Sequence, residues 1–257
     1  MSVWHGVVVF AAAFVAGMMN SVAGGGTLLT FPALVWLGID PIQANVTSTV
    51  SLWPGSLGAM YGFRRELGDS RRWMLLLAPV SVVGGLVGAF LLLRTPSRVF
   101  ASIVPYLILF ATILFAAQEP ITRRLQANRG VEPQRVNSAG WWGWAMAFQF
   151  AVAIYGGYFG AGIGILMLAA LGLLGLTDIH QMNGLKNFFA VCINLVAASY
   201  FALRGSVDWP YAAVMMAGAI AGGYGGAGLA RKLGRRFVRR AVIFIGLAMA
   251  VSLLIRR

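Results

Sequence analysis

The stretch N20-S21-V22-A23-G24-G25-G26-T27 interrupts an apolar run that extends from Val3 to Leu37. This run is long enough to cross a bilayer, which takes about 20 apolar residues. A simple membrane anchor has no use for three consecutive glycines and an Asn-Ser pair near its middle. Non-helical backbone at membrane depth is tolerated only where it is buried in protein or lines a water-filled cavity. The interruption therefore predicts such a cavity.

The composition is that of a membrane protein with several spans. Hydrophobic residues make up 59% of the 257 residues and charged residues 11%, with a mean hydropathy of +0.79. These values lie outside the range of soluble domains and predict an all-α polytopic membrane protein. A chain of this length supplies about eight spans of about 20 residues and leaves no room for a soluble domain.

Eight apolar segments follow one another along the chain. They cover Val3–Leu37 (interrupted), Ile42–Phe63, Trp73–Leu93, Val99–Ala117, Trp141–Leu176 (interrupted), Ile179–Leu203, Pro210–Ala230 and Phe237–Ile255. The polar residues 118–139, with Pro120 and Pro133 as helix breakers, are expected to form a loop-like cytoplasmic linker. This linker divides a first membrane repeat, residues 1–117, from a second, residues 140–257.

An internal repeat relates the two halves. A shift of 137 or 138 residues places L37-G38-I39-D40 on L174-G175-L176-T177, Asn45 on Asn183, and the glycine triplet on G160-A161-G162-I163-G164. The chain therefore reads as two divergent copies of a four-segment unit, each with a glycine-broken first segment. Transporters are commonly built from such repeats, with the substrate site near the midplane between them.

The distribution of basic residues predicts that the two copies are inverted. If each broken segment enters and leaves on the same side, the loops around residues 64–72, 123–135 and 231–240 share one side and hold 14 basic residues, against 5 on the other. If every segment crosses once, the division is 11 against 8. The positive-inside rule favours the first topology, which places both chain ends outside the cytoplasm.

Several other functional classes are disfavoured. The formal charge of +13 sits mostly at the ends of apolar runs, where membrane orientation explains it better than nucleic acid does. A single cysteine, Cys192, excludes an intrachain disulfide and a cysteine-based metal cluster. No metal-binding or cofactor-binding motif is found, and G160-A161-G162-I163-G164 does not follow a strand. The first segment lacks a basic leader and a cleavage site, so we expect it to be retained.

The two glycine breaks are the first candidate site. A helix that begins inside the membrane exposes free N–H groups and the positive end of its dipole, which suits an anion. Two such ends meeting from opposite sides would form a cradle for a small oxyanion, and glycine allows close approach. The alternative is that these glycines only allow close packing, which we prefer for G84-G85-x-x-G88 and G222-G223-x-x-G226. The backbone candidates are Gly24, Gly25, Gly26, Thr27, Gly160 and Gly162.

Lys186 is the one lysine or arginine well inside a predicted span. Ionisable residues at that depth are costly and usually face a cavity or a substrate path. Asn183 and Asn187 share its helical face at spacings of three and four, which favours a polar cavity. The alternative is a lysine that extends to the membrane interface.

The matching segment of the first copy reads N45-V46-T47-S48-T49-V50-S51. Asn45, Thr47 and Ser48 could bind an oxyanion, or their side chains could bond backbone carbonyls one turn back. Asn20 and Ser21 add polarity at the first break. No residue is predicted to be catalytic. An intramembrane enzyme acting on lipid or peptide, with Ser21 or Ser48 as nucleophile and His180 as base, and an assembly partner without transport activity remain alternatives.

These motifs resemble a known family. N20-S21-V22-A23-G24-G25-G26-T27, followed by F31-P32-A33-L34, G38-I39-D40-P41, A44-N45 and T47-S48-T49, resembles the first signature of the TauE/SafE sulfite exporter family, also called the TSUP permeases. Y158-F159-G160-A161-G162-I163-G164 with K186-N187-F188 and N194 resembles the second. T177-D178-I179-H180 departs from a second G-x-D-P element, so the two halves of the site need not be equivalent.

The resemblance implies a multi-pass permease of the bacterial inner membrane that moves small sulfur-containing or organic anions such as sulfite, thiosulfate and sulfoacetate. Combined with the repeat, it predicts a secondary transporter, not an enzyme, in which one repeat rocks against the other around the bound anion. Its partners are the small anion and the lipid bilayer, and protons are one candidate coupling ion. The oligomeric state is left open.

Overall fold

The computed structural model describes residues 2–22, 25–62, 67–68, 70–127, 139–174, 176, 178–233 and 235–255. Every regular element in these residues is a helix, which confirms the all-α class. The long helices are α1 (Val3–Val22), α2 (Thr27–Trp36), α3 (Pro41–Gly62), α5 (Arg71–Arg94), α6 (Ser97–Ala127), α7 (Ala139–Tyr158), α8 (Ile163–Leu173), α9 (Ile179–Leu203), α10 (Trp209–Leu233) and α11 (Arg235–Ile255).

The helices have the length and apolar character of membrane spans. Within the described residues, four are long and apolar enough to cross a bilayer: Val3–Asn20, Arg71–Arg94, Ser97–Ala117 and Ile179–Leu203. Three shorter apolar helices, Thr27–Trp36, Ile163–Gly172 and Val242–Ile255, accompany them. Large apolar side chains also cover exposed faces. The chain is thus a multi-pass membrane protein, as predicted.

Both predicted interruptions are present. α1 ends at Val22 and α2 begins at Thr27, while α7 ends at Tyr158 and α8 begins at Ile163. The backbone at these breaks adopts positive φ at Gly25 (91°), Gly160 (76°) and Gly162 (76°). Because a Cβ strains that conformation, the breaks depend on glycine.

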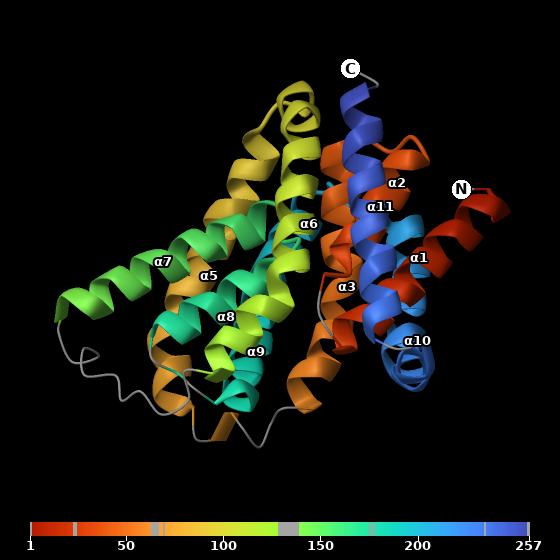
Figure 1. Cartoon of the computed structure of the whole chain (residues 1–257). Helices are drawn as coiled ribbons and strands as arrows, with labels where there is room; N and C mark the ends of the chain where they lie inside the picture. Colours follow the sequence, from red (N-terminus) through yellow and green to blue (C-terminus); the bar gives the residue numbers. More distant parts are fainter. Residues whose placement is uncertain are drawn as a thin grey trace.

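The two broken segments enter the protein from opposite directions. In Figure 1, α1 descends from the N-terminus and α2 returns upward, whereas α7 rises from the lower left and α8 returns downward. The junctions α2–α3, α5–α6 and α9–α10 lie toward the upper edge, and the lower ends of α3, α6 and α10 lie toward the opposite edge. This arrangement is consistent with the predicted inverted repeats.

Each half of the chain contributes one helix that packs with the other half: α5 from the first half and α10 from the second. The most extensive helix pairs are α1 with α10 and α5 with α7, and both pairs join the two halves of the chain. In the same way, α3 packs on α10 and α9 packs on α5. The helices therefore group into a first body (α1, α2, α3 and α10) and a second body (α5, α7, α8 and α9). α3 and α9 meet at the seam between them.

Glycines make the exchanged helix pairs close. A Cβ at Gly222 of α10 would collide with the Phe14 carbonyl of α1, and one at Gly88 of α5 would collide with the Ile154 carbonyl of α7. A Cβ at Gly84 would lie 2.6 Å from the Ala153 Cβ. The preference for packing at G84-G85-x-x-G88 and G222-G223-x-x-G226 is confirmed at these positions.

The apolar core follows the two bodies. One buried cluster consists of side chains from α5, α7, α8, α9 and the turn before α9, including Leu77, Val152, Met167 and Phe189. A second cluster joins the first body to α6, α11, the second break with the start of α8, and the last turns of α5 and α9. α6 and α11 pack on each other, with α6 also against α8 and α11 against α2. They thereby span the seam between the bodies.

One element differs from its predicted length. α6 continues beyond Ala117 and through Pro120 to Ala127, so the expected loop from Gln118 is helical over its first part. Proline is tolerated in membrane helices because neighbouring groups satisfy the freed carbonyl, and α6 also contains Pro105. Residues 128–138 of the predicted linker, including Pro133, lie outside the described residues, and its last residue, Ala139, already begins α7.

Candidate anion site

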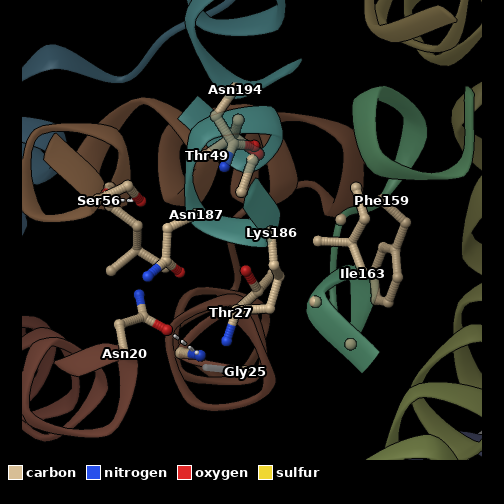
Figure 2. A pocket seen from close by; sticks show the side chains of 16 residues that line it. Asn20, Gly25, Thr27, Thr49, Ser56, Phe159, Ile163, Lys186, Asn187 and Asn194 are labelled. Atoms are coloured by element: carbon tan, nitrogen blue, oxygen red, sulfur yellow. Dashed lines mark hydrogen bonds between the residues drawn. The ribbon is translucent and has the colours of Figure 1, made fainter. Parts of the chain in front are cut away.

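A cavity of about 90 Å³ lies where the two breaks meet α3 and α9. This space suits a small polyatomic ion or a few waters. Eight predicted site residues line it: Asn20, Gly25, Gly26, Thr27, Gly160, Gly162, Lys186 and Asn187. Thr49, Leu52, Ser56, Phe159, Ile163, Gly164, Ala190 and Asn194 complete the lining. Polar side chains gather on one side, and Phe159 and Ile163 lie on the other (Figure 2).

The two long helices contribute equivalent positions to the cavity. α3 supplies Thr49, Leu52 and Ser56, and α9 supplies Asn187, Ala190 and Asn194, which are the same positions 138 residues later. The helices also start alike. The Asp40 carboxylate accepts from the Ile42 amide at 2.9 Å, and the Asp178 carboxylate from the His180 amide at 2.8 Å. Asp178 therefore keeps the cap of the G-x-D-P element although the motif around it differs.

Lys186 is the charged group at the cavity. Its Nζ donates to Asn183 Oδ1 at 3.0 Å, and Asn183 Nδ2 donates to the Ile179 carbonyl at 2.8 Å. A Cβ at Gly164 would lie 3.2 Å from Lys186 Cδ, so the lysine stem passes close to the start of α8. Asn183 is not part of the cavity lining. It orients the ammonium group instead.

The start of α8 presents backbone donors to the cavity. The Ile163 amide bonds the Gly160 carbonyl at 3.3 Å, and the Ile165 amide bonds the Gly162 carbonyl at 3.0 Å. Among the described residues, the amides of Gly162 and Gly164 have no acceptor. Both glycines line the cavity. Free amides at a helix start bind anions well because the dipole adds positive potential.

The start of α2 is capped differently. The Gly26 amide donates to Asn20 Oδ1 at 2.8 Å, so this amide is occupied and the predicted donor role of Gly26 is wrong in this conformation. Asn20 acts as a cap, and its side chain faces that of Asn187 in Figure 2. Lys186 extends toward the start of α2, near Gly25 and Thr27. Gly24 and the side chain of Ser21 lie outside the described residues.

Three predicted ligands of the first copy are buried away from the cavity lining. Asn45 Nδ2 donates to the Tyr158 carbonyl at 2.8 Å, at the end of α7. Thr47 Oγ1 accepts from the Asp208 amide at 3.1 Å, and Ser48 Oγ bonds the Thr30 hydroxyl at 2.6 Å. Their direct role in binding is therefore not supported. The sequence did not reveal these partners, because each lies outside α3, at separations of 18 to 161 residues.

Half of the lining residues were not among the predicted site residues. Thr49, Leu52 and Ser56 follow one another at helical spacing, as do their equivalents on α9. Extending the polar face of Lys186 and Asn187 by two turns finds Asn194 and, through the repeat, Ser56. Phe159 and Ile163 lie within the second break, which the glycine pattern located, but their apolar side chains gave no sign of a place in a polar site.

The arrangement does not favour the alternative enzymatic site. Ser48 is bonded to Thr30, and His180 is exposed at the start of α9. His5 lies at another edge of the molecule, where its Nδ1 is 2.8 Å from the Tyr211 hydroxyl. Among the described residues, no group of three or more His, Cys, Asp or Glu side chains lies close enough together to hold a metal ion.

Comparison with known proteins gives a consistent result. The family described as Sulfite exporter TauE/SafE matches residues 9–253. A probable membrane transporter protein of Haemophilus influenzae is 28% identical over 96% of this chain and 93% of its own length. The probable membrane transporter proteins ORF9 of a Sinorhizobium species and YfcA of Escherichia coli K12 are 26% and 27% identical, over 95% and 96% of this chain and 90% and 88% of their own lengths. No solved structure matches the chain.

Proposed function

Because the chain belongs to the Sulfite exporter TauE/SafE family, we propose that it is a secondary transporter for small sulfur-containing or organic anions in a bacterial inner membrane. Sulfite, thiosulfate and sulfoacetate are the substrates to test first. The names of its relatives support membrane transport. The observation that supports an anionic substrate is the positive potential at one cavity, where Lys186 lies close to the starts of two half-helices.

Positive groups that face each other are costly unless an anion lies between them. Lys186 extends toward the start of α2, and the free amides of Gly162 and Gly164 lie at the start of α8. We place the anion among these groups. Lys186 supplies the counter-charge, the two amides bind oxygens of the anion, and Asn187 with Thr49 orients it. The apolar Phe159 and Ile163 close the other side.

The helix packing favours the two bodies, and not the two sequence halves, as the units that move against each other. α1 is locked onto α10 and α5 onto α7 by glycine contacts, so each exchanged helix moves with its partner. The cavity lies at the seam, where α3 of the first body meets α9 of the second. Alternating access then comes from rocking of these bodies, with α6 and α11 across the seam.

Flux into proteoliposomes tests the proposed substrate class. We expect saturable uptake of sulfite or thiosulfate by the wild type. Asn187→Leu should raise the KM by about 10-fold to 100-fold, since it removes a hydrogen bond to a charged ligand worth about 1.5–3 kcal/mol. Ser102→Ala is the matched control because Ser102 is exposed and bonds only the Val99 carbonyl in the described structure. Equal KM values in the wild type and Asn187→Leu would place the anion elsewhere.

A cross-linking experiment tests which parts move. In a Cys192→Ala background, the pair His5→Cys and Tyr211→Cys bridges α1 to α10, where the two rings lie 6.3 Å apart. We expect a short bis-methanethiosulfonate reagent, which bridges two thiols through reducible disulfides, to leave at least about half of the flux, because both helices belong to the first body.

The comparison pair bridges the two bodies. Phe31 of α2 and Phe159 of the second break have ring centroids 5.4 Å apart, so Phe31→Cys with Phe159→Cys should stop flux when bridged and restore it on reduction. Flux that is blocked by the α1–α10 bridge would instead support rocking of the two sequence halves.

A further inference from the structure

We infer that this protein exchanges one anion for another across the membrane. With its cavity empty, it changes from one open side to the other only slowly. This inference rests on the proposed anion site and concerns the mode of transport. It depends on the charges at the cavity and not on which anion is bound.

The empty cavity carries an uncompensated positive charge. Lys186 is the ionisable side chain among the lining residues, and none of the described lining residues is acidic. Its hydrogen-bond acceptor, Asn183 Oδ1, is a neutral amide at 3.0 Å. The described carboxylates lie at helix starts outside the cavity lining: Asp40 and Asp178 cap α3 and α9, and Asp208 precedes α10.

The half-helix ends add to this charge. The amides of Gly162 and Gly164 have no acceptor among the described residues, and the start of α2 lies close to Lys186. In an occluded intermediate, water leaves the cavity while these groups remain. A buried charge without a partner is strongly disfavoured, so closing the empty cavity is slow.

A bound anion removes this barrier. Its negative charge compensates the ammonium group, and its oxygens accept from the free amides. The loaded protein therefore closes and reopens readily, whereas the empty one stays open to one side. The consequence is that an anion must be carried back before the next one enters, which is one-for-one exchange.

The test compares two sets of proteoliposomes at zero membrane potential and equal pH, one preloaded with unlabelled sulfite and one without it. Uptake of radiolabelled sulfite by the wild type should be at least about tenfold faster into the preloaded vesicles, since an unpaired buried charge slows the empty return. Equal rates in the two sets would overturn exchange and leave anion transport standing. No uptake into either set would overturn the proposed function and this inference with it.

Asn183→Asp is a variant in which a carboxylate balances the charge of Lys186. The substituted carboxylate takes the place of the amide oxygen that already accepts from Lys186, and it compensates the ammonium in the empty cavity. We expect the rate ratio between preloaded and empty vesicles to fall from at least about tenfold to about one, with weaker uptake at low sulfite.

Gln181→Glu is the control, because it adds the same charge to α9 outside the cavity lining and should keep the wild-type ratio. An unchanged ratio in folded Asn183→Asp would show that the charge of Lys186 does not set the mode of transport.

Discussion

Lys186→Met is expected to reduce anion uptake at low substrate concentration by at least about 30-fold, because losing one partner of a buried charge pair costs about 2–5 kcal/mol. Methionine keeps the length of the stem that passes Gly164 and removes only the ammonium group. The measurement is initial uptake of labelled sulfite into proteoliposomes, together with equilibrium binding to the purified protein. Both should fall in parallel if the lysine binds the anion directly.

The matched control is Arg204→Met. Arg204 caps the other end of the same helix, where it is exposed and lies over the Tyr200 ring. Removing that charge should leave uptake close to that of the wild type. If Lys186→Met took up the anion as fast as Arg204→Met, Lys186 would not be the counter-charge of the bound anion. That result would favour the alternative that the lysine only reaches toward the membrane interface.

Gly88→Leu is expected to prevent stable folding. A Cβ at this position would collide with the Ile154 carbonyl and lie 2.8 Å from the Tyr158 amide, both on α7. The backbone of α7 cannot move aside without separating α5 from α7, so the free energy of unfolding should fall by more than about 3 kcal/mol. The measurement is the melting temperature in detergent and the yield of monodisperse protein, with Gly88→Ala expected to lie between the wild type and Gly88→Leu.

Gly143→Ala controls for the change in helix propensity. Gly143 lies on α7 itself, and a Cβ there would meet nothing within 4 Å. Its melting temperature should equal or slightly exceed that of the wild type, since alanine favours the helix. If Gly88→Leu melted with the control, the close approach of α5 and α7 would not be needed for the fold.

The helical class and the two breaks could be predicted because their signals are local. Glycine clusters inside apolar runs leave few structural alternatives at membrane depth. The repeat then located α8 from α2, and the basic residues indicated the opposite directions that Figure 1 displays. Lys186 was found for a similar reason, since a charge inside a span is rarely placed there without a cavity.

The partners of buried polar groups could not be predicted. Asn45 and Asn183 align in the repeat, yet Asn45 holds the end of α7 whereas Asn183 holds Lys186. The position equivalent to Lys186 is Ser48, which bonds Thr30. Two copies of one pattern therefore serve different roles. The exchange of helices between halves was also hidden, since small-residue motifs do not identify their partners.

The pairing of α1 with α10 has a consequence for biosynthesis. α1 ends at Val22, but its glycine-packed partner begins only at Trp209, so most of the chain must be made before that contact exists. α5 likewise precedes α7 across the linker. The N-terminal half released alone would expose the faces of α1 and α5 that pack on α10 and α7. The two halves should therefore mature together in the membrane, and neither is expected to persist there as a stable fragment.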